Sequence, residues 1–185
     1  MIYLIASDIH GSAYFTHKLI DAYMKNDASR LILLGDILYH GPRNDLPLEY
    51  NPKKTYALLN MYRDSILCVR GNCDAEVDQM VLEFPLMADY ATLFLEELGG
   101  RMIYLTHGHH FNADNLPPMQ KGDILINGHT HLPVAKEENG FVFLNPGSIS
   151  IPKGGWPNSY ILYKDRTFTV LDFEDNVLMS LTISG

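Results

Sequence analysis

The chain has 185 residues, of which 46% are hydrophobic and 19% charged, and its formal net charge is −8 at pH 7. This length predicts a single domain over residues 1–185 that needs neither disulfides nor a structural metal to fold. The acidic balance argues against a partner that is a nucleic-acid polymer or an anionic membrane, and no segment approaches the roughly 20 apolar residues of a membrane helix. The first residues lack a basic signal-peptide region, and two cysteines (Cys68 and Cys73) are too few for a secreted disulfide framework, so we expect a cytoplasmic location.

The first half of the chain alternates short apolar runs with amphipathic stripes. Such alternation predicts right-handed βαβ units and a largely parallel sheet. Ser12 is a suitable N-cap for the first helix. Strands are expected at 2–6, 31–34 and 66–69, and helices at 12–25 and 54–62.

The second half is rich in strands separated by turn residues, which predicts hairpins and a C-terminal meander. Two sheets packed face to face, with helices outside, account for the whole pattern. The tyrosine-rich C-terminal strands leave open a homo-oligomer in which this sheet packs against a second copy. The expected strands are 90–98, 102–106, 124–127, 134–136, 141–144, 160–163, 167–173 and 177–183.

Polar blocks follow five of the predicted strands at their carboxyl ends, where open α/β sheets bind ligands. Each block contains an oxygen or imidazole ligand and a glycine that allows a tight turn. Six of the eight histidines lie in three of these blocks. The blocks are Asp8-Ile9-His10-Gly11, Gly35-Asp36, Arg70-Gly71-Asn72-Cys73-Asp74, Thr106-His107-Gly108-His109-His110 and Asn127-Gly128-His129-Thr130-His131.

Each block by itself has an ordinary structural interpretation. Asp36 suits a helix cap or turn, Asn72 suits an Asx-turn, and a lone His107 or His129 is more often a half-buried histidine than a ligand. The ordered placement of five such blocks at five strand ends favours one shared site.

Taken together, the five blocks resemble the signature of the calcineurin-like metallophosphoesterases and, more narrowly, of small bacterial phosphodiesterases of the YfcE type. Gly35 to Asn44 and Asn145 to Ser148 support this resemblance, which extends from Met1 to about Tyr163. It implies an α/β fold, a four-layer α/β–β/α sandwich of two mixed sheets. It also implies a phosphodiesterase that cleaves small phosphate esters by in-line attack of a hydroxide bridging two metals.

The family pattern implies two adjacent divalent metal ions. Ligands of mixed nitrogen and oxygen type without thiolate suit Mn, Zn, Fe or Co, with Ni also acceptable, and the resemblance favours Mn. A carboxylate suits the bridging position because each of its oxygens can face one cation. By the resemblance, Asp8, His10 and His131 hold the first ion, Asn72, His107 and His129 hold the second, and Asp36 bridges them.

Four further residues are candidates for catalysis. Cys73 stands where the wider superfamily has a histidine that protonates the leaving group, and it either takes part in catalysis or fills space. A nucleophilic role for Cys73 is rejected because the acidic residues that follow it would repel phosphate. His40 and Arg43 could contact phosphate oxygens or the second ester arm, or lie in a solvated turn, and His109 could orient the leaving group.

Two rival functions remain. A phosphomonoesterase or nucleotidase uses the same chemistry and is disfavoured by Cys73, since a thiol is a weaker acid than an imidazolium. A protein-interaction scaffold is the other rival, because the retromer subunit with this fold serves as a binding module. The intact ligand set favours the enzyme.

Overall fold

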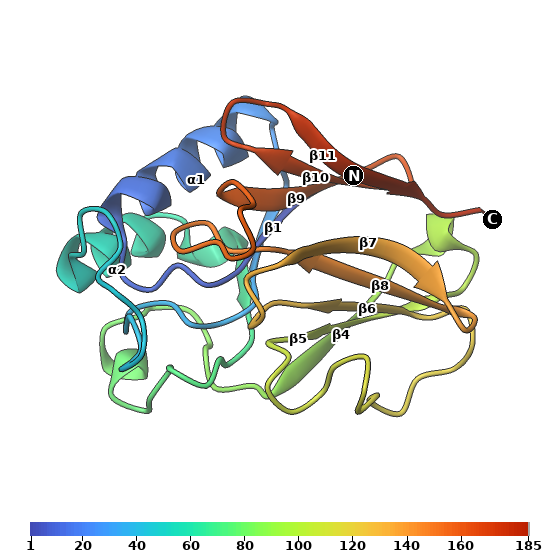
Figure 1. Cartoon of the computed structure of the whole chain (residues 1–185), viewed down its shortest axis with the longest axis horizontal. Helices are drawn as coiled ribbons and strands as arrows, with labels where there is room; N and C mark the ends of the chain where they lie inside the picture. Colours follow the sequence, from blue (N-terminus) through green and yellow to red (C-terminus); the bar gives the residue numbers. More distant parts are fainter. Residues whose placement is uncertain (185) are drawn as a thin grey trace.

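The structure, a computed structural model, describes residues 1–184, which form two stacked β-sheets with α-helices against one of them (Figure 1). The two helices are α1 (Ala13–Lys25) and α2 (Pro52–Asn60), and short 3-10 turns lie at Arg63–Ser65, Asp78–Met80 and Glu96–Leu98. The strands are β1 (Ile2–Ala6), β2 (Arg30–Leu33), β3 (Ile66–Cys68), β4 (Tyr90–Phe94), β5 (Met102–Thr106), β6 (Ile124–Asn127), β7 (Pro133–Glu138), β8 (Phe141–Pro146), β9 (Ser159–Lys164), β10 (Thr167–Asp172) and β11 (Val177–Thr182).

Both sheets are mixed, as the sequence predicts. The first has the strand order β11-β10-β9-β1-β2-β3, with β1, β2 and β3 parallel and the other strands added as an antiparallel meander. The second has the order β4-β5-β6-β8-β7, with a parallel centre of β5, β6 and β8 and an antiparallel strand at each edge. The parallel strands deliver their following loops to one edge of each sheet.

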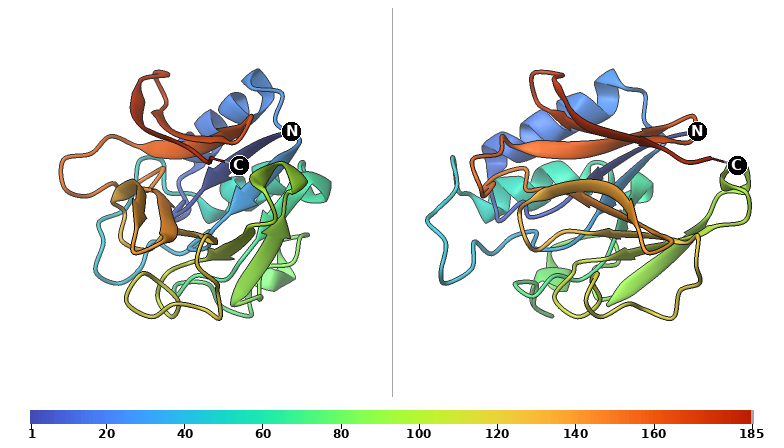
Figure 2. Two further views of the ribbon diagram at one scale, coloured as in Figure 1. Left: turned by 90° about the vertical axis from the view of Figure 1, so that its right-hand side faces the viewer. Right: turned by 45° about the vertical axis from the view of Figure 1, so that its right-hand side comes forward.

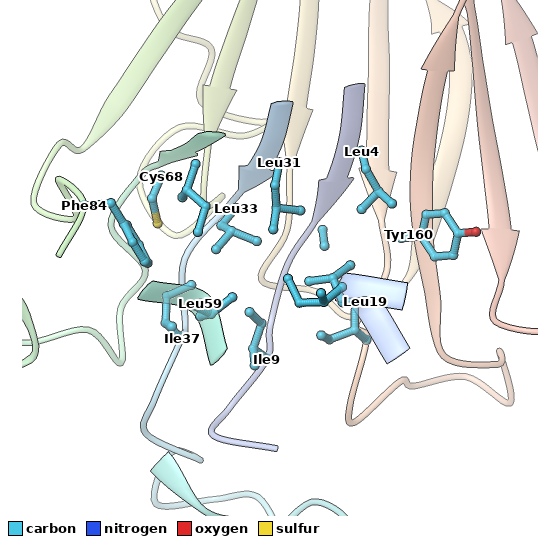
Figure 3. Packing of buried hydrophobic residues seen from close by; sticks show 14 of the residues in the cluster. Leu4, Ile9, Leu19, Leu31, Leu33, Ile37, Leu59, Cys68, Phe84 and Tyr160 are labelled. Carbon is cyan, nitrogen blue, oxygen red and sulfur yellow. The ribbon is translucent and has the colours of Figure 1, made fainter. Parts of the chain in front are cut away.

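Both helices cover the outer face of the first sheet (Figure 3). Leu19 of α1 and Leu59 of α2 belong to the same buried cluster as Leu4 of β1 and Leu31 of β2, and all four side chains are fully buried. Burial of a leucine side chain contributes about 1.5–3 kcal/mol, so this layer fixes the helices on the sheet. The loops that lead from β1 into α1 and away from β2 are thereby held in place.

A second apolar layer lies between the sheets. Ile5 and Ile32 of the first sheet pack in one cluster with Ile103 and Ile126 of the second. Two turned views show the sheets stacked on each other, with the C-terminal strands at one side (Figure 2). This layer joins the two sheets and brings their polar edges together.

The outer face of the second sheet is covered by irregular chain. Segment 107–123 runs over this face, where the Tyr104 hydroxyl donates a hydrogen bond of 2.9 Å to the Pro118 carbonyl. Leu125 and Phe143 on the same face are buried without any α-helix above them among residues 1–184. The layer expected to be helical on this side is therefore a loop.

Hydrogen bonds explain where the helices begin. The predicted cap is confirmed, because the Ser12 hydroxyl accepts a hydrogen bond of 3.2 Å from the Phe15 amide. α2 begins at Pro52, two residues before the predicted start, because Asn51 caps it and proline suits the first turn. In the described part of the chain, neither helix has the length and apolar character that crossing a membrane requires.

Candidate metal centre

All seven predicted metal ligands lie at the polar edge formed by the carboxyl ends of the parallel strands. Segments separated by more than 120 residues meet here, since the His129 amide donates a 3.0 Å hydrogen bond to Asp8 Oδ2. The ligands come from the loops after five strands: Asp8 and His10 after β1, Asp36 after β2, Asn72 after β3, His107 after β5, and His129 and His131 after β6.

Most of these ligands have an unusual backbone conformation. Positive φ angles are uncommon outside glycine, although aspartate and histidine tolerate them better than most residues. Such conformations cost about 1–3 kcal/mol each and concentrate at functional sites. The five with positive φ are Asp8 (58°), His10 (50°), Asp36 (55°), His129 (69°) and His131 (60°).

Two glycines leave room for the carboxylates. A Cβ on Gly71 would overlap the Asp36 carboxylate, and a Cβ on Gly128 would overlap Ser7 and crowd Asp8. Glycine is therefore required at both positions by close approach, because any side chain would displace a candidate ligand.

Backbone carbonyls orient three of the histidines. Each Nδ1 lies within hydrogen-bond distance of a carbonyl, which selects the tautomer that carries its proton on Nδ1. The Nε2 atom is then free to bind a metal, as is usual for metal-binding histidines. The pairs are His10 with Tyr39 (2.8 Å), His107 with Leu34 (2.6 Å) and His131 with Ile151 (2.7 Å).

The first group of ligand atoms surrounds Asp8 Oδ1. His131 Nε2 lies 3.2 Å from this oxygen and His10 Nε2 lies 3.6 Å from it, while the two imidazole nitrogens are 3.4 Å apart. Asp8 is fully buried, and its Oδ1 has no hydrogen-bond partner within the described chain. A buried carboxylate oxygen without a donor is costly, so this oxygen fits a cation.

The second group lies on the other side of Asp36. Asp36 Oδ2 is 3.7 Å from His10 Nε2 and 3.5 Å from His107 Nε2, so one carboxylate oxygen faces both groups. His107 Nε2 is also 3.0 Å from Asn72 Oδ1 and 3.2 Å from His129 Nδ1. These residues supply oxygen and imidazole ligands that suit divalent transition metals.

The pKa values reflect this crowding of opposite charges. Burial raises the pKa of Asp8, but the neighbouring His10 and His131 outweigh it and hold the pKa of that carboxyl well below its usual value. Burial lowers the pKa of His107, but Asp36 and Asp8 outweigh it and raise the pKa to about 9. A proton on the His107 imidazole competes with a cation for the same nitrogen atom.

Asp74 connects two loops of the polar edge by hydrogen bonds. It was not among the predicted site residues. Its carboxylate accepts backbone hydrogen bonds from Asp36 (2.8 Å), Ile37 (2.8 Å) and Gly71 (2.7 Å). Burial and the charge of Asp36 raise the pKa of Asp74 despite these donors. Asp74 thus ties the loop after β3 to the loop that carries Asp36, and in sequence it looks like an ordinary turn residue.

Cys73 lies within the site beside two candidate ligands. Its amide donates a 2.8 Å hydrogen bond to Asp36 Oδ1, and its Sγ lies 3.3 Å from Asn72 Nδ2. Burial and the Asp36 charge raise the pKa of the Cys73 thiol. The thiol therefore stays protonated at neutral pH, which argues against a thiolate nucleophile.

The other three candidates differ in their relation to the site. Arg43 lines the cavity at the metal ligands, whereas His40 packs edge-on between Tyr39 and Tyr50 with ring centroids 4.8 and 5.2 Å away. The His109 ring lies tilted against two neighbours, with its centroid 4.1 Å from that of His110 and 5.4 Å from that of His107. Burial lowers the pKa of His109 to about 4.

The cavity at the centre has a volume of about 490 Å³, within the usual range of ligand pockets. Its lining also includes Thr130, which the sequence places between two candidate ligands, and Lys153, which lies outside all five polar blocks. Lys153 is distant in sequence from every block. The feature that links it to the site is its contact with His131, which forms only in the folded chain. A larger groove of about 550 Å³ between α1 and α2 has no such ligand cluster, so the smaller cavity is the candidate site.

Comparison with known families agrees with this geometry. Residues 1–167 match the family described as the calcineurin-like phosphoesterase superfamily domain. The chain belongs to this superfamily, and membership implies divalent metal ions. Groups of residues that could hold a metal ion, such as Asp8, His10 and His131, are present in the described chain.

Individual relatives narrow the comparison. Phosphodiesterase YfcE of Escherichia coli (strain K12) is 44% identical over 177 residues, which are 96% of this chain and 95% of that protein. The solved structure of YfcE, a phosphoesterase from E. coli, covers 100% of both chains with a TM-score of 0.96 and 42% identity. Wild-type Vps29 of Entamoeba histolytica, complexed with Zn²⁺, covers 92% of this chain and 90% of its own with a TM-score of 0.56, and at 23% identity it shows the fold alone.

Proposed function

We propose that the chain is a single-domain phosphodiesterase that uses two divalent cations, with manganese favoured, to hydrolyse small phosphate diesters. The position of Asp36 Oδ2 carries this proposal, since it lies 3.7 Å from His10 Nε2 and 3.5 Å from His107 Nε2. One carboxylate thus joins two groups of ligand atoms. The similarity to Phosphodiesterase YfcE supports diesters as the substrate class.

The chain's residues would divide between the two cations as the motif implies. When bound, the pair would lower the pKa of a water between them for in-line attack on phosphorus and would offset the charge that develops on the phosphoryl oxygens. Asp36, with its carboxylate between the two groups of ligands, would screen the two positive charges from each other. The first ion would be held by Asp8, His10 and His131, the second by Asn72, His107 and His129, with Asp36 shared.

Cys73 stands in this proposal as a weak acid at the site. Because its pKa is raised, the thiol is a poor proton donor, and diesters whose leaving group departs without protonation should react best. Replacing Cys73 with histidine should raise kcat/KM for alkyl relative to aryl diesters, by roughly tenfold, below the about 10²–10⁴-fold of a well-placed acid. If a fully metallated C73H protein has the same alkyl-to-aryl ratio of kcat/KM as the wild type, Cys73 only fills space.

A phosphomonoesterase remains the nearest rival, and a scaffold is the rival of another class. The fold likeness to Vps29 is the observation behind the scaffold. The enzyme is favoured because Asp8 and Asp36 are buried among imidazoles, which a binding surface does not require. We further propose a cytoplasmic location, in keeping with the free thiols of Cys68 and Cys73.

Metal reconstitution tests the proposal. The protein is stripped with a chelator, reloaded separately with Mn²⁺, Zn²⁺, Fe²⁺, Co²⁺ or Ni²⁺, and assayed on bis(4-nitrophenyl) phosphate and 4-nitrophenyl phosphate. We expect two ions per chain and faster cleavage of the diester, with Mn²⁺ the most active. A preference for the monoester would support the phosphomonoesterase, and a folded, metal-loaded protein that cleaves neither would support the scaffold.

A further inference from the structure

Two basic side chains line the cavity at the metal centre, Arg43 from the loop after β2 and Lys153 from the loop after β8. The lining includes only one carboxylate, that of Asp36, and this residue is the shared candidate ligand. The chain as a whole has a net charge of −8, and Asp8 is buried behind His131, so the two basic side chains are a local feature of the cavity lining. Local charge of this kind attracts anions to a site on an acidic protein.

The Arg43 guanidinium has no hydrogen bond or ion pair within residues 1–184, unlike the other five arginines. The Lys153 ammonium also lacks a partner in the described chain, although its backbone does not. The partners of the other arginines are the Asp64 carbonyl for Arg30, the Glu83 carboxylate for Arg63, the Asp74 carbonyl for Arg70, the Gly122 and Ser184 carbonyls for Arg101, and the Ile183 carbonyl for Arg166.

The loop that carries Lys153 is fixed to a candidate metal ligand. The Lys153 amide donates a 3.2 Å hydrogen bond to the His131 carbonyl, and the His131 ring contacts the Ile151 carbonyl at 2.7 Å. His131 thus contacts the loop on both sides of Pro152. These two contacts fix the backbone of Lys153 relative to the first group of ligands.

The loop that carries Arg43 is fixed on the side of Cys73. Asn44 donates a 2.8 Å hydrogen bond from its side chain to the His40 carbonyl, and a Cβ on Gly41 would lie 3.3 Å from Cys73 Sγ. Both loops reach the same end of the molecule, at the left in Figure 1. The cavity therefore receives one basic side chain from each of two anchored loops.

We propose that Arg43 and Lys153 form a subsite for a second anionic group of the substrate, so that the preferred diesters carry a phosphate or carboxylate on one ester arm. This inference rests on the proposed function. A guanidinium supplies a planar fork of donors and an ammonium a compact charge, a combination that suits oxyanions. The volume of about 490 Å³ leaves space for more than a single phosphoryl group.

Equilibrium binding tests the subsite without turnover. Propylphosphonate and 3-sulfopropylphosphonate differ only by a terminal sulfonate, and their affinities for the Mn²⁺-loaded protein are measured by isothermal titration calorimetry. We expect the sulfonate to bind roughly tenfold more tightly to the wild type, because hydrogen bonds between charged groups are stronger than those between neutral groups. R43Q/K153Q should lose most of this preference, R43K/K153R should keep it, and K164Q, an exposed change on β9 outside the cavity, should leave it unchanged.

Kinetics identify the anion. Three 4-nitrophenyl diesters are compared whose second arm ends in a methyl, a carboxylate or a phosphate group, and the readout is the ratio of kcat/KM for each charged arm to the methyl arm. R43Q/K153Q should lower the ratio about tenfold for whichever anion the subsite accepts, with R43K/K153R near the wild-type value.

The two proposals fail in different ways. The subsite is overturned if R43Q/K153Q keeps the wild-type preference for the sulfonate, or if its kcat/KM falls equally for all three diesters. Diester hydrolysis by the wild type would be unaffected by either result. A wild type that cleaves no diester, but that loses its sulfonate preference on R43Q/K153Q substitution, overturns the proposed function and leaves the anion subsite in place.

Discussion

Buried aspartates in two regions of the molecule differ in their hydrogen bonds. At the polar edge, Asp8 and Asp36 each accept a single backbone N–H, and otherwise face imidazoles. At the other end of β6, away from the metal ligands, Asp123 accepts two backbone N–H groups at 2.9 and 2.7 Å. Asp172, at the end of β10, accepts hydrogen bonds from the backbone amides of Glu174 and Asn176. It accepts a third from the side-chain amide of Asn176.

This difference separates carboxylates that hold the fold from carboxylates that bind a cation. A buried charge needs donors or a counter-ion, and backbone amides supply the donors at Asp123 and Asp172. Asp8 and Asp36 lack that set of donors. Burial alone therefore does not mark a ligand, whereas burial with few donors and several imidazoles does.

The largest expected effect follows from removing Asp36. In D36A the two groups of ligand atoms lose their shared oxygen, and two cations left unscreened at short range would repel each other. We expect metal content to fall from two ions per chain to one or none, and kcat/KM for a diester to fall by about 10³-fold or more, since two-metal stabilisation contributes several kcal/mol. Metal analysis and steady-state kinetics measure both.

D45A provides the control, because Asp45 is an exposed residue of a nearby loop and does not line the cavity. Two ions per chain together with wild-type turnover in D36A would show that the carboxylate does not join the two groups.

Replacing single histidines should separate the two groups of ligands. H10A should chiefly weaken the first site and H107A the second, because His10 Nε2 lies 3.6 Å from Asp8 Oδ1 in the first group and His107 Nε2 lies 3.0 Å from Asn72 Oδ1 in the second. Removing a group that only orients a metal ligand typically costs about 10–100-fold in metal affinity, so loss of a ligand should cost at least as much, and turnover should fall in both variants. Competition with a metal indicator dye resolves the two affinities, and an equal loss at both sites in each variant would argue against two distinct shells.

Asp123 should behave in the opposite way. D123A leaves the Met102 and Gln120 amides without their acceptor, and we expect a loss of about 2–4 kcal/mol in the free energy of unfolding, with Tm lower by roughly 5–10 °C. Metal content and kcat/KM of the folded protein should stay at wild-type values. A D123A protein with normal stability but reduced metal content would contradict the distinction between the two kinds of aspartate.

The smallest effect concerns Asp172 and depends on pH. Burial raises its pKa, but hydrogen bonds from Asn176 and Glu174 outweigh it and hold the pKa of Asp172 below the usual value of an aspartate. The folded state thus binds the proton more weakly than the unfolded state, so the stabilisation is present above pH 4 and is lost as pH falls through the lowered pKa. D172A should be less stable than the wild type by about 1 kcal/mol at pH 7, and denaturant unfolding should show this gap narrowing in acid. A gap that widens in acid would have the wrong sign.

Sequence predicted the fold where periodicity and turn residues agree, as in β1 and in the Ser12 cap of α1. It did not predict the loop over the outer face of the second sheet, because segment 107–123 buries Leu125 and Phe143 without a periodic pattern of its own. Contacts between distant segments decide such coverage, and local propensity does not record them.

The candidate ligands were predictable because aspartates and histidines follow one strand after another at a shared edge. Asp74 and Lys153 were not, since their roles depend on contacts with Asp36 and His131 that form only in the folded chain. A contact between His40 and substrate stays a prediction, since the structure shows only that the His40 ring packs edge-on against Tyr39 and Tyr50. Proximity in sequence does not fix the direction of a side chain on a loop.

The most direct test of the two-cation centre is anomalous diffraction from crystals of the protein loaded with Mn²⁺. The account predicts two anomalous peaks about 3.5–4 Å apart on either side of Asp36, one beside His131 and the other beside Asn72. A single peak, or peaks beside Asp123 or Asp172 in place of Asp36, would contradict it.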